Sequence, residues 1–339
     1  MNLRWHPALL LVLILCFTLP VNAQMPVSVD GNSDIITAFP VEKPTQPYVI
    51  YGHPHKVGEV NWYQLRMTTG DHLVISLMTP GYNTPVPDII VMSPDTASSL
   101  EGLPPYFSVP QGYITEIIRG QNPKKAEYEP FRPAAVFKAS SYSKEITATG
   151  IYYLAVVSPA NETRYSIATG YAEKFTPSEW VLVPLNVISV HVWEGQSIIT
   201  ILTPFLAVVI LGFVVISRRE KHKGSHLTCS SWLATIAGLC YIGGAAITLV
   251  QMVRALAVTG PSSSVVLTLV FAIVPMVLGI WALRVGRESH VRTIQNRAFL
   301  LIIGILGLVF WAGLIIGPVL VIVASVLPDR LPFHHSARR

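Results

Sequence analysis

One uncharged stretch, 197–217, constrains this chain more than any other feature of its sequence. It reads SIITILTPFLAVVILGFVVIS, and as a helix it would span about 30 Å, the thickness of the hydrocarbon core of a bilayer. A basic run, RREKHK, follows at once over 218–223. Because basic loops stay on the cytoplasmic side of a membrane, we expect 24–196 to lie outside the cell and the remainder to be largely membrane.

Three more apolar segments follow, and the loops between them carry basic charge. Only 13% of the residues are charged and 51% are hydrophobic, whereas a soluble domain has about 25% charged residues. Acidic residues outnumber basic ones before 197, so the net charge of +5 reflects membrane loops and not nucleic-acid binding. We expect an all-α transmembrane bundle of four helices: spans over 197–217, 231–253, 264–283 and 298–327, cytoplasmic loops over 218–230 and 284–297, an outer loop over 254–263 and a tail over 328–339.

The last apolar segment, 298–327, is longer than one span requires and contains Gly317-Pro318. We expect one tilted and kinked span, which would place the tail outside the cell; a re-entrant hairpin is the alternative. No Asp, Glu, Lys, Arg or His falls in the middle of any of the four segments. Intramembrane ionisable residues usually mark ion or proton pathways, so the sequence argues against a pump, a secondary transporter or a voltage sensor.

The N-terminus has the pattern of a secretory signal peptide. An apolar run over 8–19 follows a basic start, and the next residues fit cleavage after Ala23; an uncleaved anchor is the alternative. We therefore expect a signal peptide over 1–23 and an exported domain over 24–174. That domain contains no cysteine, which excludes disulfides, metal–thiolate sites and a cysteine nucleophile within it.

The exported domain alternates polar and apolar residues with period 2, the pattern of half-buried strands. Turns at Gly70-Asp71 and at 159–162 join the two clearest pairs of runs, which we expect to form hairpins. The segment 24–45 is expected to be an extended lead-in, and the polar segment 121–129 to project into solvent. Short strands with Gly/Pro turns predict an all-β sandwich. The expected strands are 48–51, 60–68, 72–79, 88–92, 114–118, 134–138, 151–157 and 163–169.

Five motifs follow one another in this domain. They are W-Y-x-L, G-D-H-L-V-I-S-L, P-D-I-I-V-M-S-P, T-G-I-Y-Y-L-A-V-V and Y-S-I, at Trp62–Leu65, Gly70–Leu77, Pro87–Pro94, Thr149–Val157 and Tyr165–Ile167. Their order resembles the bacterial pre-peptidase C-terminal domain. The resemblance implies a jelly-roll-like β-sandwich that serves as a binding or stabilising accessory module, and it supplies no catalytic residues. This chain differs from the family in its long segment over 96–143.

The junction between domain and bundle, 175–196, carries a helix-start signal. Thr176, Pro177 and Glu179 fit the N-cap, the first turn and a capping box. Two tryptophans, Trp180 and Trp193, are placed to sit at the headgroup level as interfacial anchors. We expect an interfacial helix that docks the sandwich on the membrane; a further strand followed by a linker is the alternative.

A pair of histidines, His53 and His55, lies on an expected loop. An H-x-H pair can contribute to a Zn or Cu site, but the site needs a third ligand. The candidates in the sequence are His72, Asp71 and Glu59, and ordinary surface histidines without a metal are the alternative.

Other chemical signatures are few. Asn161 opens the sequon Asn-Glu-Thr on an expected turn, so it is a glycosylation candidate in a host that glycosylates exported proteins. The sequence has no G-x-S-x-G, H-E-x-x-H, P-loop or dinucleotide fingerprint, and we expect no cofactor.

These features predict a multi-pass protein of the plasma membrane with an extracytoplasmic β-sandwich. We expect a non-enzymatic surface module for binding or interaction, with the lipid bilayer and an envelope glycan or another membrane protein as partners. Two alternatives remain open at this point: an accessory subunit of a larger membrane complex, and a metal-dependent membrane enzyme that uses His53 and His55.

Overall fold

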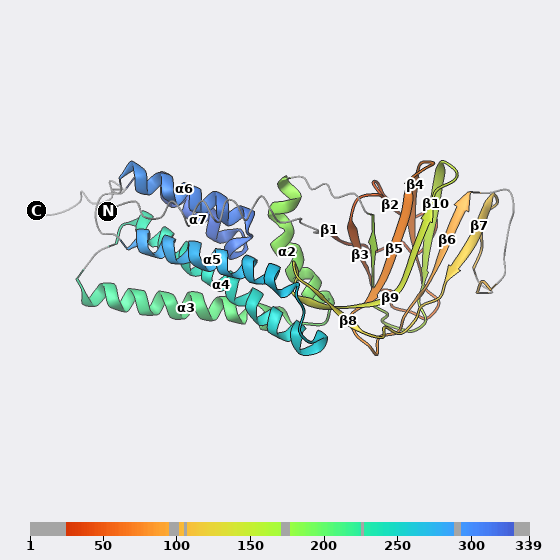
Figure 1. The fold of residues 1–339 in the computed structure, drawn as a ribbon, viewed down its shortest axis with the longest axis horizontal. Coiled ribbons are helices and arrows are strands. Elements are labelled where there is room, and N and C mark those ends of the chain that lie inside the picture. The colour runs from red at the N-terminus through yellow and green to blue at the C-terminus, as the bar shows by residue number, and fades with distance from the viewer. Residues whose placement is uncertain are drawn as a thin grey trace, which may run out of the picture.

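The protein has a β-rich part followed by a helical part, with one helix, α2, standing between them (Figure 1). The computed structural model describes residues 25–94, 102–104, 107–170, 177–224, 227–287 and 293–328. The expected signal peptide and the tail from 329 onward lie outside the described residues.

Two sheets form the β-rich part, which confirms the expected all-β sandwich at that level. Their inward-facing apolar side chains meet in one core. The six-stranded sheet has the order β1 (Met25–Ser28), β3 (Tyr48–Gly52), β11 (Tyr165–Thr169), β5 (His72–Thr79), β9 (Ala134–Glu145) and β8 (Ala126–Glu129). The five-stranded sheet has the order β2 (Phe39–Val41), β4 (Val60–Met67), β10 (Gly150–Val157), β6 (Asp88–Pro94) and β7 (Tyr113–Ile118).

The two predicted hairpins are wrong, because each turn crosses between the sheets. β4 pairs with β10 while β5 pairs with β11 and β9, and β10 and β11 likewise lie in different sheets. The Gly70-Asp71 turn is still built as expected: the Asp71 carboxylate accepts a hydrogen bond from the Thr68 backbone N–H at 2.8 Å, and Gly70 has a φ of +90°. Alternation reports which face of a strand is buried, and that face is the same in a hairpin and in a crossing.

The core between the sheets contains a buried pair of tyrosines. The hydroxyl groups of Tyr63 and Tyr165 lie 2.7 Å apart, and the Tyr165 ring fills the space beside Gly52, where an added Cβ would lie 2.3 Å from it. Trp62, which breaks the alternation of its strand, lies on the outer face of the five-stranded sheet. There it stacks on Phe107 with ring centroids 5.2 Å apart. A second apolar cluster on this outer face therefore explains why Trp62 stands where the alternation predicts a polar residue.

Three strands were not expected. β1 and β2 arise within the predicted lead-in and pair in parallel with β3 and β4. β8 lies in the segment expected to project into solvent, but Ala126 is 1% exposed and the Tyr128 hydroxyl lies 2.7 Å from the hydroxyl oxygen of Thr268 in the helical part. The prediction is therefore right for the start of the segment, where Gln121, Asn122, Lys124 and Lys125 are exposed. It is wrong for the end, where Tyr128 contacts a partner that lies far away in the sequence.

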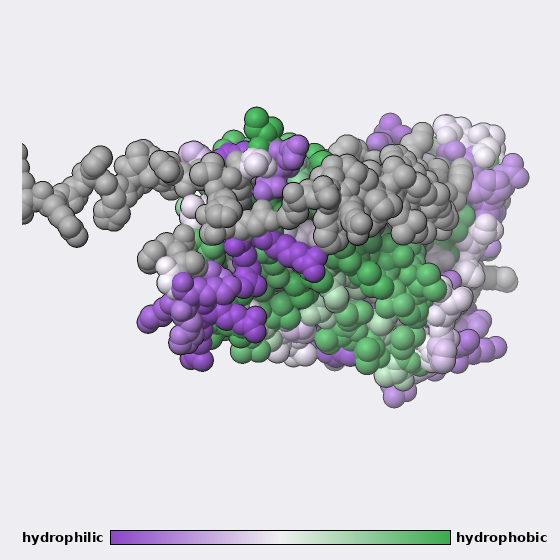
Figure 2. All heavy atoms as spheres, turned by 60° about the vertical axis from the view of Figure 1, so that its left-hand side comes forward, coloured by the Kyte–Doolittle hydropathy of each residue, from purple (hydrophilic) through white to green (hydrophobic). Residues whose placement is uncertain are grey.

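Among the described residues, three helices are long and apolar enough to cross a membrane: α3, α4 and α5. Each covers one of the first three predicted spans. The side chains of Ser197 and Thr228 cap the N-termini of α3 and α4. Figure 2 shows apolar side chains gathered along the middle of the helices, with hydrophilic ones toward the ends. The helices are α2 (Pro177–Trp193), α3 (Ile198–His222), α4 (Cys229–Thr259), α5 (Val265–Gly286), α6 (Ile294–Val309), the 3₁₀ turn η1 (Ala312–Leu314) and α7 (Ile316–Val326).

The fourth predicted span is not one kinked helix. It consists of α6 and α7, which are joined by a turn with left-handed backbone at Trp311 and Gly313 and pack against each other. The Arg297 side chain, at the start of α6, donates a hydrogen bond to the Leu327 carbonyl at 3.0 Å, so the two ends of 298–327 meet. The tip of this hairpin packs closely on α4, where an added Cβ on Gly244 would lie 2.8 Å from the Gly313 nitrogen.

Within the junction, Pro177–Trp193 form the expected helix, α2, and not a further strand. The residues of the predicted capping box before Pro177 lie outside the described residues. Pro184 lies inside α2. Val190 of this helix packs against Val49 and Tyr51 on the outer face of the six-stranded sheet.

Candidate functional site

The predicted histidine pair lies on the loop that follows β3, beside the turn between β10 and β11. Backbone hydrogen bonds join the two loops: the Thr163 N–H donates to the Pro54 carbonyl at 3.0 Å and the Glu162 N–H to the His55 carbonyl at 3.3 Å. Pairing of β3 with β11 brings the loops together, because Gly52 is opposite Tyr165 in that register. The turn therefore carries Glu162 to the histidines.

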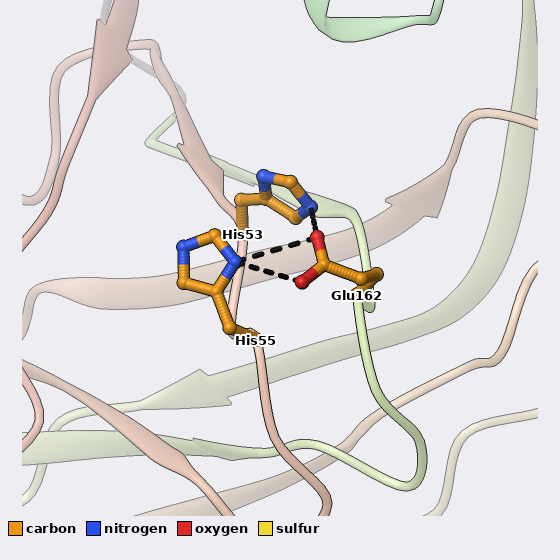
Figure 3. Close-up of side chains that lie close together, drawn as sticks. All are labelled: His53, His55 and Glu162. Carbon is orange, nitrogen blue, oxygen red and sulfur yellow. Dashed lines mark hydrogen bonds and ion pairs between the residues drawn. The ribbon is translucent and has the colours of Figure 1, made fainter.

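The carboxylate of Glu162 faces both imidazole rings (Figure 3). Its Oε2 atom is 3.0 Å from His53 Nε2 and its Oε1 atom is 3.1 Å from His55 Nδ1. One ligand atom from each of the three side chains lies within 4.8 Å of the other two. His53 Nε2 is buried and has no partner of acceptable hydrogen-bond geometry among the described residues, so this nitrogen contacts the carboxylate without a well-formed bond.

The third ligands considered from the sequence do not join this cluster. Glu59 is near, but its carboxylate accepts hydrogen bonds from the backbone N–H groups of His55 at 2.8 Å and Lys56 at 3.1 Å. Asp71 closes its own turn. His72 begins β5 at the other end of the six-stranded sheet, since β5 runs antiparallel to β11.

Sequence reasoning missed Glu162 as a member of the cluster. The only sequence signal was its position on a turn, next to the sequon residue Asn161, and nothing in the sequence pairs that turn with the histidine loop. Asn161 itself is exposed, and its side-chain oxygen accepts a hydrogen bond from the Val57 N–H at 3.2 Å. Its glycosylation stays a prediction.

A second candidate site is the buried polar network where the sandwich meets the helices. The turn between β8 and β9 carries Arg132, which forms an ion pair with Glu194 at the end of α2. The other oxygen of Glu194 lies 3.0 Å from His191 Nδ1, and the His191 side chain is 1% exposed. Gln196 and Gln251 exchange two amide hydrogen bonds at 2.8 and 3.2 Å, which extends the network to α4.

Burial and the neighbouring positive charges shift the pKa values of the two carboxyl groups of this network in opposite directions. Burial acts to raise the pKa of Glu194, but Arg132 and His191 outweigh it, so the pKa is lowered. For Glu129, which also faces Arg132, burial dominates and raises the pKa. Glu194 is therefore the carboxylate held in its charged form by the guanidinium, while Glu129 is a carboxyl group whose charged form is destabilised by burial.

Aromatic side chains surround the network. Phe131, next to Arg132, packs edge-on against Phe271 of α5 with centroids 5.7 Å apart. Trp180 packs on Trp311 at 4.7 Å, and the Trp311 indole N–H donates to the Trp180 carbonyl at 2.9 Å. Trp193 packs on the ring of Tyr51 at 4.8 Å. The two predicted interfacial anchors thus make contacts within the protein, and a role at lipid headgroups stays a prediction.

A cavity of about 250 Å³ lies between α2 and the outer face of the six-stranded sheet. Its apolar wall includes Val49, Met78 and Val187, and its polar side includes Glu129 and Arg132. Cavities that bind drug-sized ligands are about 300–1,000 Å³. This one suits waters or a small group rather than a whole ligand, so we interpret it as part of the junction.

Comparison with known proteins adds no family to these observations. Scans against protein-family models and against curated proteins return no match to this chain. The resemblance to the pre-peptidase C-terminal domain therefore stays a prediction from the five motifs.

Proposed function

We propose that this is an integral membrane protein of the plasma membrane whose β-sandwich faces outward and binds a component of the cell envelope, a glycan or another membrane protein, without catalysing a reaction. The observation that carries the proposal is the junction. A tether requires only a linker, whereas the Arg132–Glu194 ion pair and the aromatic contacts of Phe131 fix the sandwich on the helices. A fixed junction of this kind suits a module that must present one face to its ligand.

The proposed orientation rests on charge. Basic residues occupy the last turns of α3 and α5, among them Arg219, Lys221 and Arg284, and these two helices end away from the sandwich (Figure 1). Basic loops stay cytoplasmic, so the sandwich would be outside.

The proposed binding face is the one turned away from α2, part of which Leu103 and Phe107 cover. On the outer face of the five-stranded sheet, the rings of Tyr113 and Tyr153 pack edge-on with centroids 5.5 Å apart, and both are half-buried. Tyrosine combines a large apolar area with a polar hydroxyl and is enriched in binding surfaces. We assign the ligand contact to this tyrosine pair and its surroundings, in keeping with the accessory-module role that the pre-peptidase resemblance implies.

Co-sedimentation of the full-length protein in nanodiscs with separated envelope fractions tests the proposal. We expect saturable binding to one fraction and a loss of about tenfold or more in affinity for the double variant Tyr113→Ala/Tyr153→Ala, because alanine removes contact residues of the kind that dominate binding energy. Tyr82→Ala, which removes a 43% exposed tyrosine elsewhere on the sandwich, is the matched control and should bind normally. Absence of binding to every fraction, or equal loss in the control, contradicts the proposal.

An accessory subunit of a larger membrane complex is the second candidate, and α3 is the observation that favours it. This helix packs mainly on α4 and exposes large apolar side chains along its length, among them Ile199 at 73% and Leu211 at 65%. Purification in a mild detergent separates the candidates: a stoichiometric second protein supports the subunit, and a lone particle that still binds an envelope fraction supports the binding module.

A further inference from the structure

The geometry points to a binding site for a divalent transition-metal ion, of the Zn²⁺ or Cu²⁺ type, formed by His53, His55 and Glu162. Two imidazoles and one carboxylate are a donor set that such ions use in proteins. The inference is independent of the proposed function, because the site lies on a different part of the sandwich from the tyrosine pair.

The positions of the ligand atoms suit one shared ion. In a tetrahedral zinc site with bonds of about 2.0–2.2 Å, neighbouring ligand atoms are about 3.3–3.6 Å apart. Glu162 already lies 3.0 Å from His53 Nε2 and 3.1 Å from His55 Nδ1, and none of the three ligand atoms is more than 4.8 Å from another. Small rotations of the side chains would therefore complete the coordination without a change in the backbone.

An ion pair without a metal explains the cluster less completely. Both histidines converge on one carboxylate, and their ring centroids are 4.7 Å apart. Buried polar atoms almost always have a partner, yet His53 Nε2 has none of acceptable geometry within the described residues. A bound cation would give this nitrogen a partner.

The backbone holds the ligands in place before any ion binds. The Glu59 carboxylate fixes the histidine loop through the N–H groups of His55 and Lys56, and the Thr163 N–H joins that loop to the Glu162 turn. Glu162 has a φ of +54°, a left-handed conformation that costs roughly 1–3 kcal/mol in a residue other than glycine. The fold therefore organises the three ligands largely before an ion binds.

The site lies beside the junction. The residue before His53, Gly52, accepts a hydrogen bond from the Trp193 indole at 3.4 Å. The residues after Glu162 lead to Arg164, which donates to the Trp193 carbonyl at 3.2 Å. His55 and Glu162 are more than half exposed, so a bound ion would keep a coordination position open to solvent or to a ligand. Binding should stabilise both loops that contact the end of α2.

The test is isothermal titration of the full-length, tag-free and chelator-treated protein in detergent with Zn²⁺ and, separately, Cu²⁺. We expect one ion per chain, and a loss of about tenfold or more in affinity for His53→Ala, His55→Ala and Glu162→Gln, since even outer-shell changes at metal sites cost 10–100-fold. His72→Ala is the matched control, because it removes another exposed histidine of the same sheet, and it should bind as the wild type does.

A second readout guards against variants that misfold. Zn²⁺ should raise the Tm of the wild type and of His72→Ala but not that of Glu162→Gln, whose Tm without metal should equal that of the wild type. No saturable binding of either ion to the wild type, or unchanged affinity in Glu162→Gln, would falsify the site.

Discussion

At the scale of single residues, Glu194 and Glu129 differ although both face Arg132. The pKa of Glu194 is lowered, because Arg132 and His191 outweigh burial, whereas burial raises the pKa of Glu129. Glu194→Gln leaves the buried guanidinium without its ion-pair partner, which typically costs about 3–5 kcal/mol. Glu129→Gln removes a carboxyl group that is destabilised when charged, so it should leave the Tm unchanged or raise it. Thermal unfolding of the purified protein at neutral pH measures both; a larger loss in Glu129→Gln contradicts the assignment.

The same pair gives a pH dependence with a definite sign. Because the pKa of Glu194 in the folded protein lies below its usual value of 4.5, its contribution to stability is present above that pH and is lost as the pH falls through the folded value. Glu129, with a raised pKa, acts in the opposite direction. On acidification the wild type should therefore lose its Tm advantage over Glu194→Gln, whereas it should gain Tm relative to Glu129→Gln, because protonation relieves the cost of burying the Glu129 carboxylate.

The members of the two candidate sites could be predicted from the sequence only in part. The spacing of His53 and His55 identified two members of the cluster, because ligands two residues apart on a loop are local information. Glu162 could not be found, since its approach depends on the pairing of β3 with β11. The same limit applies to Arg132, whose partner Glu194 follows it by more than sixty positions and comes from another element.

At the scale of elements, periodicity located most strands and helices but not their partners. β5 begins and ends where the alternation predicts, yet its neighbours are β11 and β9 and not β4. The last apolar segment failed for a related reason: its length suits one tilted span, and the reversal depends on left-handed backbone at non-glycine residues such as Trp311 and Ile315. No simple sequence rule favours that conformation there.

Sided labelling of introduced cysteines tests the α6–α7 hairpin. In a Cys229→Ser background, which removes an exposed thiol, Thr293→Cys and Pro328→Cys place thiols just before α6 and just after α7. Because Arg297 binds the Leu327 carbonyl, both thiols should react with an impermeant reagent from the same side of the membrane. Ser263→Cys, between α4 and α5, is the control and should react from the opposite side. Labelling of 293 and 328 from opposite sides would contradict the hairpin and support a single span over 298–327.

At the scale of the whole molecule, composition and charge separate the β-rich part from the apolar helices, and the structure confirms that division. The contact between them was predicted only through α2. The β8–β9 hairpin was missed, because Tyr128 of β8 and Phe131 of the turn contact α5 across a long sequence separation. Within the described residues, α2 and this hairpin thus join the sandwich to the helices. One linker would leave the orientation of the sandwich free, whereas two separate contacts oppose both tilting and rotation.

If the β8–β9 turn fixes the sandwich on the helices, removal of the buried Arg132 charge should widen the range of sandwich orientations without unfolding either part. Arg132→Ala breaks the ion pair with Glu194, whose two side chains are 17% and 15% exposed. Spin labels on Gln111→Cys and Ser263→Cys, in a background that lacks Cys229 and Cys240, report the distance from sandwich to helices. We expect one narrow distance distribution in the parent protein and a clearly broader one in Arg132→Ala.

The control lies on the same hairpin. Lys138→Ala breaks the ion pair with Glu127, whose side chains are 53% and 56% exposed, and exposed pairs contribute about 0–1 kcal/mol. Its distance distribution should match that of the parent. If Arg132→Ala also matches the parent, α2 and the aromatic contacts suffice to hold the sandwich, and the ion pair is a consequence of the fixed orientation and not its cause.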